Sequence, residues 1–194
     1  MTDTDLSPAQ MQKSNAILDA ANEHFAANGF EATKLSDVAK DAGVAVGTIY
    51  LRYNGKAELL AGVLDRTEAA FCAAMDTPVV WATPFPQRFT LVVSAMLSTA
   101  QKEANLAKLM ALVSYASQPS SPDKSRILLK IEEHIQDGMD RGELRADVDP
   151  ILTSRMAHGM VDGAMRELMT NPKRDAKETT RHIAEAYARW LMKA

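Results

Sequence analysis

Apolar residues recur at three- and four-residue steps along most of this 194-residue chain, and this periodicity restricts its fold more than any other feature. Ile17, Ala20, Ala21 and Phe25 show the pattern in the first such segment. Runs in which Val, Ile or Thr alternate with polar residues, as in a half-buried strand, are scarce. The sequence therefore predicts an all-α protein, and its 46% of hydrophobic residues are enough to form a core.

Glycine, proline and Asn-Gly signals divide this pattern into about nine expected helices. The expected segments are about 8–28, 33–42, 45–53, 56–75, 86–103, 105–118, 122–141, 150–170 and 175–193. Three prolines between Thr77 and Pro86 end the fourth helix, because proline lacks a backbone N–H and restricts the residue before it. We expect a small amino-terminal head, residues 1–56, followed by a larger helical bundle, residues 57–194.

Charge is unevenly distributed along the chain. The net charge of −3 and the pI near 5.8 argue against a general nucleic-acid coat protein, so any nucleic-acid contact must come from a local patch. Residues 1–32 carry one lysine against five acidic residues, whereas residues 33–56 carry four basic residues against two acidic ones. Positive charge therefore gathers in the segment that contains the second and third expected helices.

No segment suits a membrane or an export signal. The longest uncharged stretches, residues 89–101 and 109–122, are shorter than the roughly 20 apolar residues that cross a bilayer. Residues 1–12 contain two acidic residues and lack the basic start and apolar run of a signal peptide. Cys72 is the single cysteine, which excludes an intrachain disulfide and a cysteine-rich zinc site. We expect a cytoplasmic protein without membrane contact.

Residues suited to catalysis or metal binding are not clustered. The four histidines fall on four different expected helices without metal-ligand spacing, at His24, His134, His158 and His182. Cys72 has no histidine nearby in sequence, and no G-x-S-x-G, H-E-x-x-H or glycine-rich phosphate loop occurs. We expect no catalytic residue, no metal site and no cofactor. A metal- or thiol-dependent enzyme is the least supported alternative.

Residues 33–56 have the spacing of a helix-turn-helix. Ala39 is small where two helices would touch, Gly43 can adopt the left-handed conformation that ends the first helix, and Ile49 can fix the second helix to the core. Ile49 and Tyr53 then face inward. The outer face of the second helix carries Val46, Gly47, Thr48 and Tyr50. The segment predicts a DNA-reading unit, and the alternative is an ordinary helix-loop-helix corner.

Residues 17–60, which include AGVAVGTIY followed by an aromatic residue and a lysine, resemble the DNA-binding head of the TetR family of bacterial transcriptional repressors. The resemblance implies a second, divergent helical domain that dimerises through its last two long helices and holds a small-molecule pocket. It also implies a homodimer on a palindromic double-stranded DNA operator, released by a small, largely apolar effector. A helical small-molecule or protein-binding module without sequence-specific DNA binding is the alternative.

The resemblance assigns roles to individual residues. Thr48 and Tyr50 match family residues that contact DNA. Tyr53 matches a buried aromatic residue, Lys56 a phosphate-binding lysine, and Arg52 a position that is often polar or basic. The full set of expected DNA contacts is Lys34, Ser36, Val46, Gly47, Thr48, Tyr50, Leu51, Arg52 and Lys56.

The expected reading helix is poor in side chains that donate two hydrogen bonds to one base. Ala45 stands where the family commonly has serine, Val46 follows it, and Leu51 comes after Tyr50. We therefore expect apolar contact with thymine methyl groups and the shape of the DNA to contribute to recognition.

Apolar stripes on two bundle helices are expected to line the effector pocket, although such stripes are also typical of plain core packing. The expected pocket residues are Phe89, Val93, Met96, Met110 and Val113. Methionine-rich linings adapt to varied apolar ligands, since the thioether chain has many low-energy shapes.

The segment 150–170 carries an expected dimer seam. Gly159 and Gly163 lie one turn apart beside Met156 and Met160, and small residues at this spacing let another helix approach closely. An incidental pattern is the alternative. The same segment also carries a polar strip, which consists of Arg155, His158, Asp162 and Arg166. The strip is compatible with a position facing the ligand, the partner subunit or solvent.

Overall fold

The computed structural model describes residues 7–85, 87–102, 125–171 and 173–192. The helices in this part of the chain are α1 Pro8–Ala32, α2 Leu35–Asp41, α3 Val46–Tyr50, α4 Lys56–Met75, α5 Pro78–Ala82, α6 Gln87–Lys102, α8 Arg126–Asp140, α9 Pro150–Thr170 and α10 Ala176–Leu191. The β-pairing within the same residues is limited to one bridge, between Leu144 and Met192. The predicted all-α fold is confirmed. Among these helices, none combines the length and the apolar character that a membrane span requires.

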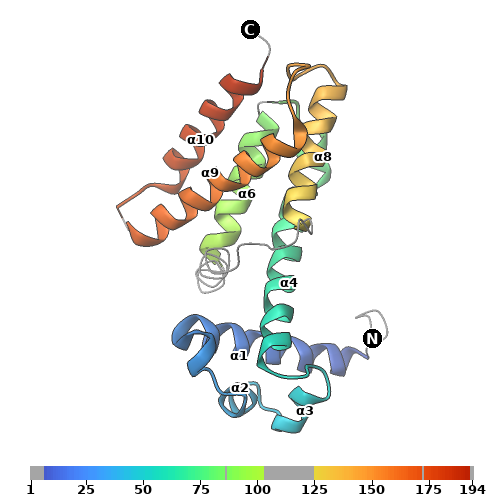
Figure 1. Ribbon diagram of the computed structural model, residues 1–194, viewed down its shortest axis with the longest axis vertical. Coiled ribbons are helices and arrows are strands. Elements are labelled where there is room, and N and C mark those ends of the chain that lie inside the picture. The colour runs from blue at the N-terminus through green and yellow to red at the C-terminus, as the bar shows by residue number, and fades with distance from the viewer. Residues whose placement is uncertain (1–6, 86, 103–124, 172, 193–194) are drawn as a thin grey trace.

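Helix α4 joins two bodies of unequal size (Figure 1). The head, made by α1, α2 and α3, lies at one end of the molecule, and α6, α8, α9 and α10 form a bundle at the other. Leu59 and Val63 of α4 belong to the buried core of the head, whereas Phe71 and Met75 belong to that of the bundle. The predicted division between residues 56 and 57 therefore falls at the start of a helix that contributes to both cores.

Helix α1 begins and ends where its sequence provides hydrogen-bond partners. Ser7 and Gln10 form a reciprocal capping box at its start. At Gly29, where the sequence predicted the end of the helix, the backbone leaves the helical conformation with a φ of 74°. One further helical turn then extends to Ala32. Thr33 closes this turn, because its hydroxyl donates to the backbone carbonyl of Gly29 at 2.7 Å.

The proline-rich segment after α4 contains a one-turn helix, α5, where the sequence predicted only a break. Pro78 occupies the first turn, in which a backbone N–H has no helical partner to lose, and the Thr77 hydroxyl accepts a hydrogen bond from the Val80 amide at 3.3 Å. Proline therefore ends α4 and begins α5. The helix expected at 105–118 lies outside the described residues.

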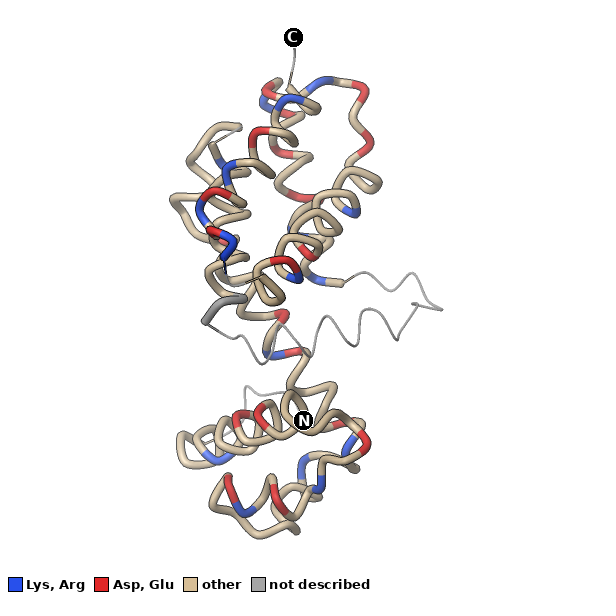
Figure 2. Tube along the Cα trace, turned by 90° about the vertical axis from the view of Figure 1, so that its left-hand side faces the viewer, with Lys and Arg blue, Asp and Glu red and all other residues tan. Residues whose placement is uncertain are grey.

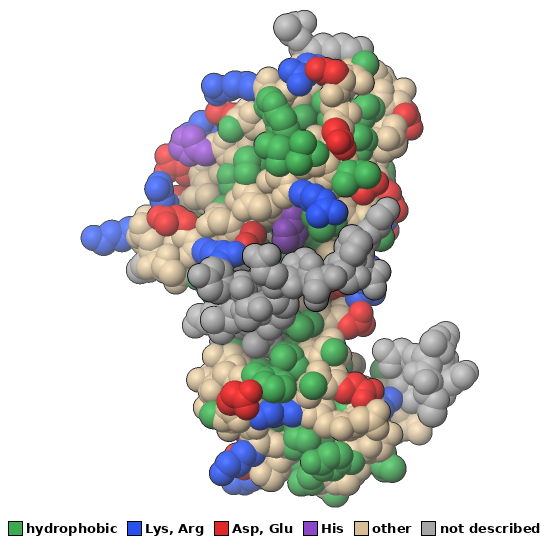
Figure 3. Space-filling model, viewed as in Figure 1, with side chains coloured by type: hydrophobic (Ala, Val, Ile, Leu, Met, Phe, Trp, Pro, Cys, Tyr) green, Lys and Arg blue, Asp and Glu red, His purple; other side chains and the backbone are tan. Residues whose placement is uncertain are grey.

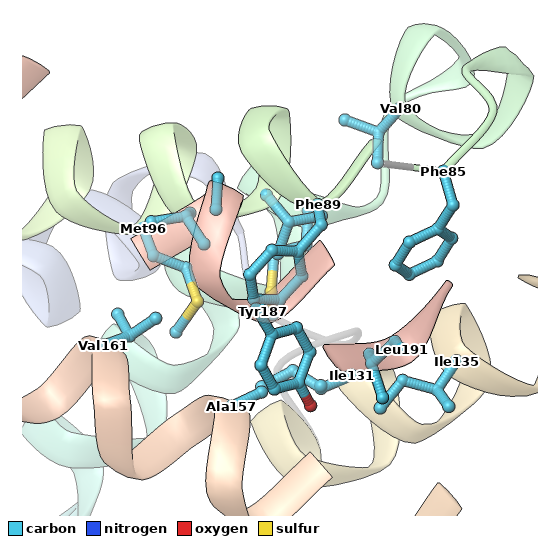
Figure 4. Close-up of a cluster of buried hydrophobic side chains, with 14 of the residues drawn as sticks. Val80, Phe85, Phe89, Met96, Ile131, Ile135, Ala157, Val161, Tyr187 and Leu191 are labelled. Atoms are coloured by element: carbon cyan, nitrogen blue, oxygen red, sulfur yellow. The ribbon is translucent and has the colours of Figure 1, made fainter. Parts of the chain in front are cut away.

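The bundle core is built from apolar and aromatic side chains of α6, α8, α9 and α10 (Figure 4). Phe89 of α6 stacks on Tyr187 of α10, with ring centroids 4.3 Å apart, and the Tyr187 hydroxyl donates to the Thr153 carbonyl of α9 at 2.5 Å. Arg88 is fully buried next to this core; it pairs with Asp137 and donates to the Thr83 carbonyl at 2.7 Å. These contacts tie all four bundle helices to the segment that follows α4.

Candidate nucleic-acid interface

The turn between α2 and α3 has the geometry that the sequence predicted. Gly43 adopts a φ of 66°, and the amide of Val44 donates to the Ala39 carbonyl at 2.9 Å. Ala39 and Ile49 are both buried in the head core, so the small residue allows the approach and Ile49 fixes α3. The helix-turn-helix prediction is confirmed.

Helix α3 separates its residues into an inner and an outer face. Ile49 is fully buried, whereas the next residue, Tyr50, is 56% exposed. Val46 and Gly47 are exposed as well, and Thr48 is half-buried. In Figure 3, hydrophobic side chains gather at the end of the molecule where Figure 1 places α3. The outer face of α3 is therefore apolar, with hydroxyl groups from Thr48 and Tyr50.

Tyr53 follows α3 and packs against the head core, but it is half-buried where the resemblance implied a buried aromatic residue. A Cβ atom added at Gly62 of α4 would lie 3.0 Å from Tyr53 Cε1, so the ring occupies the space that this glycine leaves. Sequence reasoning missed Gly62, because a glycine inside a helix gives no indication of which side chain approaches it.

Two of the expected DNA-contacting cations are held by the backbone of α1. Arg52 donates to the Gln10 carbonyl at 3.1 Å. Lys56 donates to the Glu31 carbonyl at 2.8 Å and lies 4.7 Å above the Phe30 ring. Both contacts fix the side chains beside the helix-turn-helix, and each leaves further N–H donors for phosphate oxygens.

The remaining expected contacts on α2 are open to solvent. Ser36 and Lys34 are exposed at the start of α2; Lys40, which is not in the expected set, is exposed near its end. Within the described residues the side chain of neither lysine forms a hydrogen bond or an ion pair. Figure 2 shows basic residues interspersed with acidic ones in the head, in agreement with the modest positive charge counted for residues 33–56.

One contact of the head was not expected from the sequence. His24 Nε2 of α1 lies 2.8 Å from the carboxylate of Asp41, the last residue of α2. Seventeen positions separate the two residues, so no local pattern could have indicated the pair. It fixes the end of α2 against α1 and thereby the start of the turn into α3.

The expected pocket residues of α6 lie in the bundle core. Phe89, Val93 and Met96 are all buried there, and Figure 4 shows Phe89 and Met96 directed toward α9 and α10. Met110 and Val113 lie outside the described residues. Sequence reasoning missed Tyr187 and Val161, which share this core, because their stripes resemble any other buried helix face.

The expected dimer seam on α9 faces outward. Met156, Gly159 and Gly163 are exposed, and a Cβ atom at either glycine would meet nothing within 4 Å. Met160 is half-buried and packs against the bundle core. Leu152, one turn before Met156, is also exposed and continues this face toward the start of α9.

The four residues of the polar strip of α9 differ in their exposure and in their partners. Arg166 pairs with Asp162 one turn away, and Arg155 is exposed. Burial lowers the pKa of His158, and the negative charges of Asp162 and of Glu68 on α4 partly oppose this shift. His158 is half-buried, and the effect of Glu68 on its pKa indicates that the ring lies near α4.

A model of the family described as "Bacterial regulatory proteins, tetR family" matches residues 17–63. A fatty acid metabolism regulator protein of Bacillus subtilis is 28% identical over 163 residues, which cover 81% of this chain and 84% of the relative. The crystal structure of the regulator FadR from Bacillus subtilis, in complex with stearoyl-CoA, superposes with a TM-score of 0.77 at 26% identity and covers 90% of this chain and 97% of that one. A tetR family transcription regulator from Shewanella sp. PV-4 gives the same TM-score and identity, with 94% and 99% covered.

Proposed function

This chain belongs to the TetR family of bacterial regulatory proteins, and from that membership we propose how its parts carry out repression and its release. The protein is a ligand-responsive, DNA-binding transcriptional repressor and not an enzyme. We infer that it acts in the cytoplasm, where its DNA target is.

The outer face of α3 is proposed to enter the major groove. The observation that carries this proposal is the contrast between fully buried Ile49 and its exposed neighbour Tyr50. Val46 and Gly47 are exposed like Tyr50, and Thr48 is half-buried; we propose that all three reach base edges from the start of α3. Lys34, Ser36, Leu51, Arg52 and Lys56 complete the proposed contact set, with Arg52 and Lys56 near the phosphates.

A symmetric homodimer is proposed, with the exposed face of α9 as its seam and α10 beside it. Met156, Gly159 and Gly163 provide an apolar strip with room for close helix approach. Trp190 of α10 adds a further exposed apolar ring. Few cations occur in each head, so two heads on one palindrome would roughly double the number of neutralised phosphates and raise affinity accordingly.

The effector is proposed to be a molecule with a long apolar chain, such as a long-chain acyl-CoA. The similar FadR structure was obtained with stearoyl-CoA. In this chain Phe89, Val93 and Met96 provide buried apolar surface of the matching chemistry, next to Tyr187. We propose that the apolar chain of the effector contacts these residues together with Met110 and Val113.

Helix α4 is the proposed connection between effector and head, because it contributes to both cores. An effector that favours a bundle conformation with a different α4 orientation would change the separation of the two heads. The effector can shift the equilibrium between the two conformations only by the difference between its binding free energies for them.

Selection of bound fragments from a random duplex library by the purified protein tests the DNA half of this proposal. We expect an enriched sequence with two inverted half-sites, and anisotropy titrations should show affinity that falls with salt. Lys56→Ala should weaken binding to all duplexes and reduce the salt dependence, whereas Tyr50→Ala should change the preference among them. Absence of enrichment would support a binding module without sequence-specific DNA recognition.

Titration of the protein–duplex complex with stearoyl-CoA tests the effector half, with coenzyme A alone as the control. We expect stearoyl-CoA to release the duplex and coenzyme A to leave it bound. Equal affinity for the duplex at saturating stearoyl-CoA would contradict the proposed effector class.

A further inference from the structure

Leu51, which directly follows α3, has the largest exposed fraction, 86%, of the exposed large hydrophobic side chains in the described chain. Its backbone is not a loose loop. The residue caps α3 in the right-handed helical region, and its amide donates to the Gly47 carbonyl at 3.0 Å. The backbone thus fixes the direction in which the side chain leaves the chain, and almost all of the side-chain surface is in water.

The surroundings of Leu51 extend this apolar surface. Tyr50, its neighbour in sequence, is exposed, as is Val46 at the start of α3, and α3 itself carries no charged residue. The nearest cation in sequence, Arg52, is turned toward α1, where it donates to the Gln10 carbonyl. This end of the helix-turn-helix therefore has no charged group with which to read a base edge.

In the major groove only one base presents an apolar group, the C5 methyl of thymine. A leucine placed against a donor or acceptor of any other base edge would remove water from that group without replacing its hydrogen bond. We propose that Leu51 is a specificity-determining residue that recognises a thymine methyl group in each half-site, with Tyr50 beside it. This inference rests on the proposed placement of α3 in the major groove.

The test uses the duplex that wild-type protein selects from a random library. Each thymidine of that duplex is replaced in turn by deoxyuridine, which removes only the methyl group and keeps the base pair. Binding is measured by anisotropy for wild type, Leu51→Ala and Leu51→Met. Val79→Ala is the matched control, because Val79 is an exposed apolar residue of α5 in the other part of the molecule.

Wild type should lose about fourfold in affinity when one critical thymidine per duplex is replaced, and about fifteenfold when its symmetric mate is replaced as well. Leu51→Ala should bind the parent duplex more weakly and lose this sensitivity, whereas Leu51→Met and Val79→Ala should retain it. Circular dichroism melting should show no loss of stability in Leu51→Ala, since an exposed side chain buries little surface on folding.

The inference fails if no deoxyuridine replacement weakens wild type, or if each replacement weakens wild type and Leu51→Ala equally. In either case an enriched duplex with salt-dependent binding would leave the proposed DNA-binding function intact. If the library yields no enriched duplex, the proposed function and this inference fail together.

Discussion

Glu68, midway along α4, accepts a 2.5 Å hydrogen bond from the hydroxyl of Ser125, the residue that precedes α8. The same carboxylate oxygen accepts the Ile127 amide at 3.3 Å. Ser125 makes no capping bond to its own helix, so α4 supplies the N-cap of α8 from outside. Arg126 adds a second link to α4 through Asp65 at 2.6 Å.

Glu68→Ala should remove the external cap and lower the free energy of unfolding by about 1 kcal/mol, the usual worth of an N-cap. Glu132→Ala on α8 is the matched control, because the side chain of Glu132 makes no hydrogen bond or ion pair within the described residues. Urea denaturation followed by circular dichroism measures both variants. Equal stability of the two would show that the Glu68 contacts contribute nothing net.

Gly138 of α8 is required for the close approach of the segment before α6. A Cβ atom at this position would lie 2.8 Å from Phe85 Cδ2 and 3.0 Å from Leu144 Cδ1. Gly138→Ala should lower the free energy of unfolding by about 1–3 kcal/mol, although alanine is otherwise the better helix former. Phe85→Leu should cost less in the Gly138→Ala background than in wild type, since the smaller side chain relieves the overlap. Additive losses in this double-mutant cycle would contradict the proposed overlap.

Local spacing accounts for what the sequence predicted correctly. Ala39, Gly43 and Ile49 all lie within one helix-turn-helix, so their roles follow from backbone geometry and from the periodicity of α2 and α3. The exposure of Tyr50 followed from the burial of its neighbour Ile49.

Contacts between segments that are distant in the sequence could not be predicted from local spacing. Arginine is rarely fully buried, so nothing local marked Arg88 as the partner of Asp137 in the bundle. The backbone acceptors of Arg52 and Lys56 on α1 depend on how the head packs. Which apolar stripe is core and which is pocket likewise depends on the neighbouring helices.

His134 makes the stability of the bundle dependent on pH. It is buried on α8, stacks on Trp81 with centroids 4.0 Å apart, and lies 3.2 Å from the Met75 carbonyl at the end of α4. Burial, and then the positive charge of Arg88, lower its pKa from 6.5 to about 4, with Lys130 acting in the same direction and Asp76 opposing it.

In the unfolded chain the pKa of His134 returns to about 6.5, so between pH 6.5 and 4 the unfolded state binds a proton that the folded state does not. Stability is therefore fully present above pH 6.5 and is lost as the pH falls toward 4, by up to about 3 kcal/mol.

His134→Gln should reduce the slope of the free energy of unfolding against pH, measured by denaturation across this range. His182→Gln, at an exposed position of α10, should leave the slope unchanged. Some slope should remain, because burial also lowers the pKa of His158. An unchanged slope in His134→Gln would assign the pH dependence to other groups.

Met156→Glu tests the proposed seam on α9. In a symmetric dimer through this face the substitution brings two carboxylates toward each other and places charge in an apolar contact. Dimer affinity should then fall about tenfold or more. Val79→Glu introduces the same charge at an exposed apolar position of α5 and should leave dimerisation unchanged. Sedimentation velocity over a range of protein concentrations measures the association. Anisotropy on the selected duplex should show a parallel loss, because a monomer contacts one half-site. A Met156→Glu protein that remains as dimeric as wild type would exclude this face as the seam.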